Sequence, residues 1–171
     1  MKVLQTERLA LRQLDLADAP FILALLNDPG WIRYIGDRGV RTVEAAAAYL
    51  ESRMLAQYAK HGFGLWMVES RARAEPMGIC GLVKRDALPV PDLGFAFMPA
   101  YRGQGFAHES ALAARDHATR ALGIRRLLAI TSPVNAASAR LLERLGFVAE
   151  GEMPWAGDDK DPVTVYAFAP A

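Results

Sequence analysis

The sequence is poor in cysteine, has no strong excess of one charge and contains no long apolar run, and each shortage excludes a class of protein. Its single cysteine, Cys80 in "MGICGLV", cannot form a disulfide framework within the chain, and no cysteine or histidine spacing suggests zinc. Lysine and arginine number 20 against 19 acidic residues, which argues against the concentrated basic face that nucleic-acid binding needs.

No apolar run approaches the roughly 18–20 residues that span a bilayer. Glu7, Arg8 and Arg12 interrupt the N-terminal stretch, where a signal peptide would be apolar. We therefore expect a cytoplasmic protein with no metal and no membrane or nucleic-acid partner.

Length and composition are those of one globular unit. Hydrophobic residues make up 52% and charged residues 23%, which is typical of a folded soluble chain and not of a disordered one. The 171 residues are close to the usual size of one domain and can enclose one continuous core. No internal repeat, low-complexity tract or linker divides the sequence, so we expect a single domain over residues 1–171.

Hydrophobic periodicity predicts an α/β protein. Strands are expected at residues 8–14, 64–70, 77–84, 92–98, 125–131, 147–153 and 162–168. Helices are expected at residues 15–28, 43–62, 104–122 and 135–146, and the aromatic segment 31–39 is expected to be irregular. The third helix carries a stripe of small residues at Ala107, Ala111, Ala114, Ala118 and Ala121. The order β-α-α-β-β-β-α-β-α-β-β predicts a mixed sheet with helices on its faces, against which this stripe would pack closely.

The stretch "RGQGFA", residues 102–107, lies between an expected strand and the alanine-rich helix. A glycine turn at this junction is typical of a phosphate site, because the first N–H groups of a helix and the positive end of its dipole point at the ligand. A dinucleotide turn fails twice: His108 stands where its third glycine or alanine would be, and Thr131 and Ser132 end the next strand where an acid is needed. The ATP- and GTP-binding pattern G-x-x-x-x-G-K-[ST] is absent as well.

Two motifs together resemble the GNAT superfamily of N-acetyltransferases. Its acyl-CoA signature, (Q/R)-x-x-G-x-(G/A), is matched by Arg102, Gly105 and Ala107. A later segment, N-x-x-S-x-x-x-x-x-x-x-G-F, is matched by Asn135, Ser138, Gly146 and Phe147. The opening "TERLALRQLDLADAPFILALLNDP" resembles the Rim-type branch, whose best-known members acetylate the N-termini of ribosomal proteins. The likeness covers nearly the whole chain and implies a GNAT-like fold with acetyl-CoA as the co-substrate.

The resemblance implies where the donor would bind. Backbone N–H groups of residues 103–107 would hold the pyrophosphate, with added charge from Arg102, and the pantetheine arm would pair with main chain near Phe97 and Met98. The expected donor-binding residues are Phe97, Met98, Arg102, Gly103, Gln104, Gly105, Phe106, Ala107, Asn135 and Ser138. Asn135 and Ser138 also have a purely structural interpretation as the cap and third residue of a helix.

The catalytic groups depart from the family pattern. Many members carry a tyrosine general acid where this chain has Leu142, so the leaving thiolate would take its proton from Ser138 or from water. Asp92 begins the expected central strand near the place of an acidic base in family members, and it would act directly or through water. The alternative is that Asp92 only ends a loop. Cys80 has no evident partner base that would make it a nucleophile.

We expect direct attack of a primary amine on the thioester through a tetrahedral intermediate. Deprotonating a lysine amine, with a pKa of about 10.4, costs roughly 4–5 kcal/mol at pH 7, against roughly 1 kcal/mol for an α-amine with a pKa near 8. The resemblance to the Rim-type branch and the lower cost of deprotonation both favour a protein or peptide N-terminal α-amine as the acceptor. A small amine such as an aminoglycoside, a polyamine or an amino acid is the alternative, and a catalytically weak CoA-binding sensor is a third hypothesis.

Acceptor specificity is expected from two segments, residues 27–39 and 151–163. Trp31, Tyr34 and Trp155 are candidates to line the acceptor site or to anchor loops. Asp158, Asp159 and Asp161 would attract a cationic acceptor, or would only solvate a turn. The sequence is compatible with a monomer or a homodimer.

Overall fold

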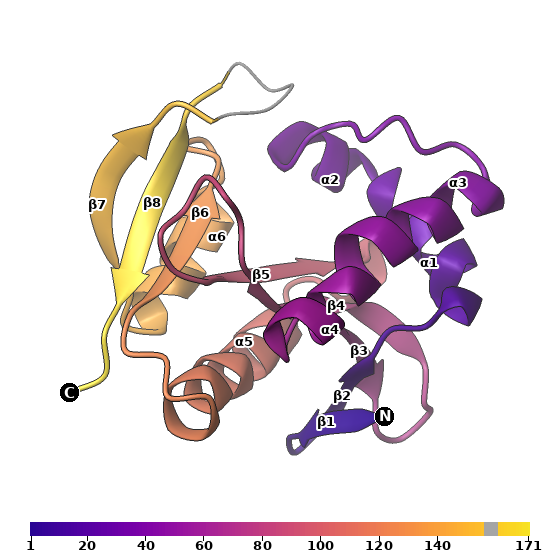
Figure 1. The fold of residues 1–171 in the computed structure, drawn as a ribbon, viewed down its shortest axis with the longest axis horizontal. Helices are drawn as coiled ribbons and strands as arrows, with labels where there is room; N and C mark the ends of the chain where they lie inside the picture. The colour runs from indigo at the N-terminus through magenta and orange to yellow at the C-terminus, as the bar shows by residue number, and fades with distance from the viewer. Residues whose placement is uncertain (156–160) are drawn as a thin grey trace.

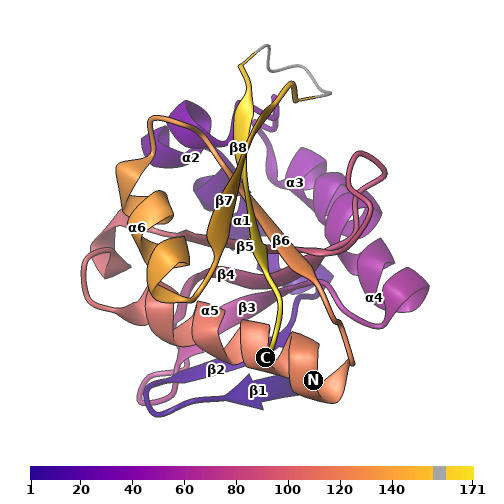
Figure 2. The ribbon, with the colours of Figure 1, turned by 90° about the vertical axis from the view of Figure 1, so that its left-hand side faces the viewer.

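The computed structural model describes residues 1–155 and 161–171, which form one eight-stranded sheet with helices on both faces (Figures 1 and 2). The strands are β1 Lys2–Gln5, β2 Leu9–Gln13, β3 Leu65–Ser70, β4 Pro76–Val83, β5 Asp92–Phe97, β6 Leu127–Thr131, β7 Val148–Met153 and β8 Val163–Phe168. The helices are α1 Ala19–Leu26, α2 Pro29–Tyr34, α3 Val43–Tyr49, α4 Ala56–His61, α5 Phe106–Asp116 and α6 Ala136–Arg144. Within the described ranges, no helix has both the length and the apolar character of a membrane span.

The strands lie in the order β1-β2-β3-β4-β5-β6-β8-β7. Six neighbouring pairs are antiparallel, and β5 with β6 is the parallel pair. Each of these two strands is followed by a helix, so α5 and α6 begin at the same edge of the sheet. The predicted mixed α/β sheet is confirmed, and the seven predicted strands correspond to β2 through β8.

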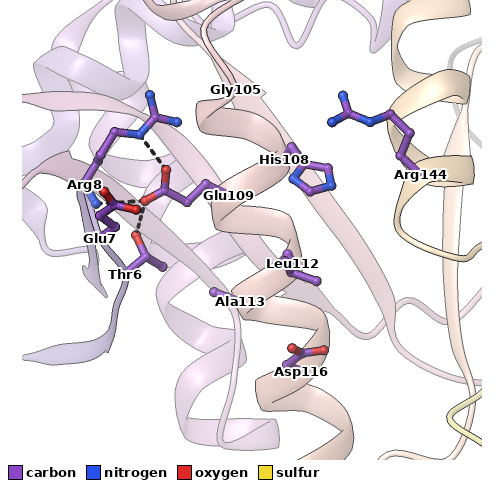
Figure 3. A pocket seen from close by; sticks show the side chains of 10 residues that line it. All are labelled: Thr6, Glu7, Arg8, Gly105, His108, Glu109, Leu112, Ala113, Asp116 and Arg144. Carbon is purple, nitrogen blue, oxygen red and sulfur yellow. Dashed lines mark hydrogen bonds and ion pairs between the residues drawn. The ribbon is translucent and has the colours of Figure 1, made fainter.

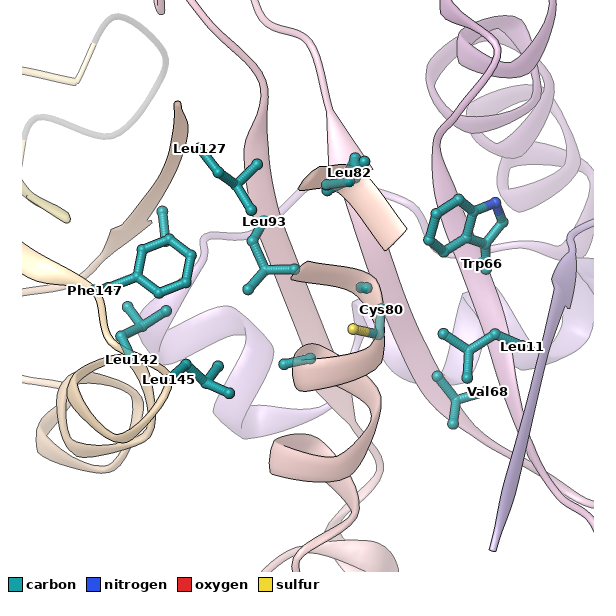
Figure 4. Packing of buried hydrophobic residues seen from close by; sticks show 14 of the residues in the cluster. Leu11, Trp66, Val68, Cys80, Leu82, Leu93, Leu127, Leu142, Leu145 and Phe147 are labelled. Atoms are coloured by element: carbon teal, nitrogen blue, oxygen red, sulfur yellow. The ribbon is translucent and has the colours of Figure 1, made fainter. Parts of the chain in front are cut away.

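Alternation along each strand sends side chains to two separate cores. Trp66 and Cys80 join the cluster beneath α5 and α6, which Figure 4 shows around Leu93, Leu127 and Leu142. Their neighbours Met67 and Ile79 instead join the cluster beneath α1–α4, together with Trp31 and Leu50. The sheet therefore separates one face covered by α5 and α6 from another covered by α1–α4.

The alanine stripe predicted for α5 packs against the sheet over its middle part. Ala111, Ala114 and Ala118 are fully buried, while Ala107 is half-buried and Ala121 is exposed beyond the core. The side chains are small, so the helix axis lies close to the sheet and a larger residue would overpack the contact.

Helix ends follow the chemistry that the sequence predicts. Thr42 accepts the N–H of Ala45 at 3.1 Å and begins the helical stretch formed by α3, a π-helical turn at Leu50–Leu55, and α4. Gly62 ends it with φ +76°, a left-handed conformation that favours glycine. Gly123 follows the α5 stretch with φ +68°.

Two short elements were not predicted. β1 pairs antiparallel with β2 at the sheet edge, and α2 occupies part of the segment expected to be irregular. Asp28 caps α2, because its side chain accepts the N–H of Trp31 at 3.1 Å, and Pro29 stands at the first helical position. The Pro29–Gly30 pair therefore begins a helix and does not only end the preceding one.

Candidate active site

The parallel strands β5 and β6 meet at one end and then diverge. Asp92 of β5 pairs with Leu128 of β6, and the Leu128 N–H donates to the Pro91 carbonyl at 3.0 Å. Beyond this point each strand keeps its other neighbour: β5 stays paired with β4 through Phe97, and β6 with β8 through Thr131. Figure 1 shows the two strands running in different directions. The sheet is therefore split at its centre, on the side where α5 and α6 begin.

The backbone of β5 offers hydrogen-bonding groups to this split. The Met98 N–H donates to the Met77 carbonyl at 3.0 Å, which makes Met98 face β4. Because antiparallel pairs alternate between bonded and non-bonded positions, Phe95 and Phe97 turn their N–H groups the opposite way, toward β6. Of the main chain expected to pair with a pantetheine arm near Phe97 and Met98, the Met98 amide is therefore already bonded to β4. Phe97 keeps its expected place, although its carbonyl accepts Arg102 Nε at 3.0 Å.

The glycine turn that follows β5 presents N–H groups that have no hydrogen-bond partner among the residues that the structure describes. Gly103 and Gly105 have φ of +72° and +83°, and Gly105 occupies the cap position of α5, where no side chain accepts a hydrogen bond. The first N–H groups of α5, from Phe106 to His108, have no carbonyl one turn back to bond within the helix. With the positive end of the helix dipole, this turn is suited to an anion.

Arg8, in the turn before β2, braces the glycine turn from outside, a role that the sequence did not indicate. Its guanidinium donates to Glu109 at 2.7 Å (Figure 3). It also donates to the Gln104 carbonyl at 3.1 Å and lies 4.3 Å from the centre of the Phe106 ring. This contact offsets the charge of Glu109, the acidic residue in the first turn of α5. Gln104 additionally donates its side-chain amide to the Ala100 carbonyl at 2.8 Å.

A shallow pocket of about 550 Å³ runs along α5 from the glycine turn. Figure 3 shows Arg8 and Glu109 on one side of α5 and Arg144 on the other, with the Arg144 guanidinium directed from α6 toward the first turn of α5. Burial lowers the pKa of His108, which lies between them, and the nearby positive charges of Arg144 and Arg115 lower it further. Arg144 is therefore the cation on that side of the pocket, whose lining also includes Glu7, Glu109 and Asp116.

The start of α6 supports the structural interpretation of Asn135. Its side chain accepts the Ser138 N–H at 3.2 Å and caps the helix. Ser138 is half-buried in the first turn. Leu142, which stands at the tyrosine position of the family pattern, is 1% exposed and packs in the core (Figure 4).

Asp92 is a buried carboxylate with one unused oxygen. It is 1% exposed, and its Oδ1 accepts Arg85 Nε at 2.9 Å. Its Oδ2 has no hydrogen-bond partner among the described residues. Burial raises the pKa of Asp92, and Arg85 and Lys84 oppose that rise. An unpartnered buried oxygen is costly, and such carboxylates are common at functional sites.

Strand alternation places Asp92 on the face opposite α5 and α6. Leu93 and Phe97 belong to the cluster beneath α5 and α6, whereas Ala96 packs in the cluster beneath α1–α4. Asp92, Gly94 and Ala96 share this second face, and the side chains after Asp92 are small. The Asp92 carboxylate therefore lies on the face that α1–α4 cover, whereas α5, the helix that follows the glycine turn, covers the other face.

The aromatic candidates differ from their predicted setting. Trp31 is 7% exposed and packs in the cluster beneath α1–α4, so it anchors α2 and is not a loop residue. Tyr34, half-buried, ends α2 beside Arg33. Trp155 is half-buried with the Arg85 guanidinium 5.5 Å from its ring centre, which places it next to the partner of Asp92. Asp158 and Asp159 lie outside the described residues, and Asp161 is exposed.

Cys80 is poorly placed to act as a nucleophile. Its side chain is fully buried under α5, and burial raises the pKa of the thiol to about 12.

Comparison with known proteins decides the family. The acetyltransferase (GNAT) domain family matches residues 8–148, which is most of the chain. The chain belongs to the GNAT acetyltransferase family. The Bacillus subtilis protein described as the uncharacterized N-acetyltransferase YoaA is 30% identical over 152 residues, which are 87% of this chain and 84% of that protein. This chain is accordingly an acyltransferase.

Solved structures of GNAT enzymes share the fold. A RimL ribosomal L7/L12 α-N-protein acetyltransferase in complex with coenzyme A has a TM-score of 0.83 at 20% identity, covering 99% of this chain and 98% of the other. A spermidine N-acetyltransferase SpeG chimera from Vibrio cholerae and hSSAT has a TM-score of 0.77 at 18% identity, covering 95% and 96%. At these identities the likeness concerns the fold and does not choose between the two acceptor classes.

Proposed function

We propose that this GNAT protein transfers acetyl from acetyl-CoA to an N-terminal α-amine of a protein or peptide. The observation that carries the proposal is the split between β5 and β6, which leads from the glycine turn at residues 102–107 to Asp92. The residues present fit the donor. The unpaired N–H groups of Gly103–His108 suit the pyrophosphate of CoA. Arg144, beside the pocket along α5, suits the phosphate of CoA that lies farther from the glycine turn. The amides of Phe95 and Phe97 suit an extended pantetheine arm.

Acetyl-CoA supplies an activated thioester, and the chain supplies positioning and proton transfer. The Phe97 N–H, directed into the split, would donate to the thioester oxygen as negative charge develops there. Asp92, with Oδ2 unpartnered, would take the proton of the attacking amine through water, because its buried carboxyl lies five strand residues, about 16 Å along β5, from Phe97. Leu142 cannot protonate the departing thiolate, so that proton would come from Ser138 or water, and a thiol near pKa 8.5 needs little assistance.

The acceptor would reach Asp92 from the face that carries α1–α4. Tyr34 on α2 and Trp155 beside Arg85 would bound its site, while the buried Trp31 would hold α2 in place. A carboxylate such as Asp92 is a weak base even when burial raises its pKa. An α-amine suits such a base, because an α-amine loses its proton much more readily than a lysine amine. A small amine is the alternative that the likeness to the spermidine enzyme supports.

Thermal unfolding with acetyl-CoA, and with NAD and ATP as controls, tests the donor. A ligand present at about 100 times its dissociation constant adds roughly 2.7 kcal/mol, a midpoint shift of roughly 5–10 °C for a domain of this size. Peptides with free and blocked N-termini, and a set of polyamines and aminoglycosides, then test the acceptor by release of free CoA. A shift with acetyl-CoA but no CoA release from any amine would favour the sensor hypothesis. No shift at millimolar acetyl-CoA would contradict the proposed site.

A further inference from the structure

Arg102 connects three parts of the proposed site. Its Nε donates to the Phe97 carbonyl at 3.0 Å, and its Nη2 forms an ion pair with Asp28. The same carboxylate oxygen of Asp28 accepts the Trp31 N–H at 3.1 Å and so begins α2. One side chain therefore joins the end of β5, the glycine turn and the start of α2.

Asp28 keeps the guanidinium in this position. The Asp28 side chain is 3% exposed, whereas that of Arg102 is 46% exposed. Moving the guanidinium onto a phosphate would leave a buried carboxylate without its cation, which is strongly unfavourable. Held by these contacts, the Arg102 guanidinium is not a free surface charge.

Gly30 shows that the space around the ion pair is fully used. A Cβ at Gly30 would lie 3.0 Å from both terminal nitrogens of Arg102 and 3.0 Å from Asp28 Oδ2. Gly30 lies in α2 and is not among the residues with positive φ, so its backbone does not require glycine. The missing side chain instead leaves room for the ion pair.

We propose that Arg102 is a positioning residue that couples the donor turn to the acceptor helix α2 and is not a ligand of the donor phosphates. This inference rests on the proposed function. Donor binding would order the turn, and through Arg102 and Asp28 it would hold α2 in the position that receives the amine. Such coupling is reciprocal, so the amine would raise the affinity for acetyl-CoA by the same factor.

Substitutions separate positioning from phosphate binding. Asp28→Asn removes the partner and leaves the Arg102 charge available, Arg102→Gln removes the charge, and Gly30→Ala displaces the pair without changing any charge. We expect each to raise the KM of the amine about tenfold, and the Asp28→Asn/Arg102→Gln double variant to raise it no further than either alone. The dissociation constant of acetyl-CoA alone, measured by calorimetry, should change less than about threefold, and its salt dependence should be unchanged.

The opposite pattern would overturn the proposal. A phosphate ligand predicts that Arg102→Gln weakens acetyl-CoA binding about tenfold or more and reduces its salt dependence, that Arg102→Lys largely restores binding, and that Asp28→Asn does not weaken it. Independent, multiplying effects of Asp28→Asn and Arg102→Gln on the amine KM would also contradict coupling. Arg53→Gln, an exposed charge on the π-helical turn, is the control for loss of one positive charge.

The readouts distinguish this inference from the proposed function. If the wild-type protein neither binds acetyl-CoA nor releases CoA, the proposed function fails. If the wild type is active and only the pattern among the variants differs, the role of Arg102 fails alone. Gly30→Ala serves where loss of the ion pair prevents folding, because it retains both charged partners.

Discussion

Gly105 combines a backbone conformation and a close contact that a side chain would disturb. Its φ is +83°, and an added Cβ would lie 3.2 Å from Arg8 Nη2, the group that braces the turn. We expect Gly105→Val to cost about 1–2 kcal/mol in backbone strain and to weaken acetyl-CoA binding about tenfold or more.

Gly62→Val is the matched control, since Gly62 has φ +76° and no neighbour within 4 Å of an added Cβ. Calorimetric titration with acetyl-CoA compares the two variants. Equal affinities in both would mean that the glycine turn does not hold the donor.

Asp92 predicts a characteristic pH dependence. Burial raises its pKa, so the basic form is lost as the pH falls through that raised value, and the rate should decline on the acid side. Asp92→Asn should lower kcat/KM by about 10²–10⁴-fold above that pKa and abolish the acid limb.

Rates measured from acidic to alkaline pH test this expectation, with Asp86→Asn, an exposed acid on the loop before β5, as the control. An acid limb that survives in Asp92→Asn would assign the titration to another group, and water would then be the base.

Sequence alone predicted the residues whose roles are local. The glycine turn and Asn135 could be identified because conformation and capping depend on neighbours a few positions away. The Arg102–Asp28 pair joins residues 74 positions apart, so no local pattern reveals it. Arg85 was missed although it is only seven residues before Asp92, because charged residues in a polar loop usually face solvent.

Among the elements, α6 tests whether Asn135 is a cap or a donor ligand. Asn135→Ala removes the acceptor for the Ser138 N–H and should cost about 1 kcal/mol, a fall of roughly 2–4 °C in Tm. Asn135→Asp keeps the cap and should keep Tm.

Acetyl-CoA affinity then separates the two roles. If Asn135 only caps α6, the Asp variant retains both Tm and affinity. Retained Tm with weakened binding in Asn135→Asp would instead show that the amide contacts the donor.

The longer elements were predictable, and the short ones were not. The stretch from Val43 to His61 repeats its apolar residues at helical spacing, whereas α2 has only six residues. Its start, Asp28–Pro29, is a helix-initiating pair, but the preceding helix made it look like a stop signal. β1 has four residues at an edge and pairs with a single neighbour, which leaves little alternation to detect.

For the whole molecule, we expect two half-buried histidines to make stability fall on mild acidification. Burial lowers the pKa of His108 and of His117, the latter packed edge-on against Trp66. The unfolded chain then binds protons first, so the free energy of unfolding is greatest above about pH 6.5 and declines below it. Urea denaturation between about pH 7 and 5 should show this decline, and His108→Gln/His117→Gln should flatten it. An unchanged slope in the double variant would assign the decline to other groups.

The split between β5 and β6 has α5, the helix that follows the glycine turn, on one face of the sheet and Asp92 on the other. In the proposed enzyme, acetyl-CoA and the amine therefore approach from opposite faces of the sheet, and neither blocks access for the other. Both are on the protein before either product departs, which is a sequential kinetic scheme. Double-reciprocal plots of initial velocity should intersect. The acetylated product and free CoA should dissociate from opposite faces of the sheet.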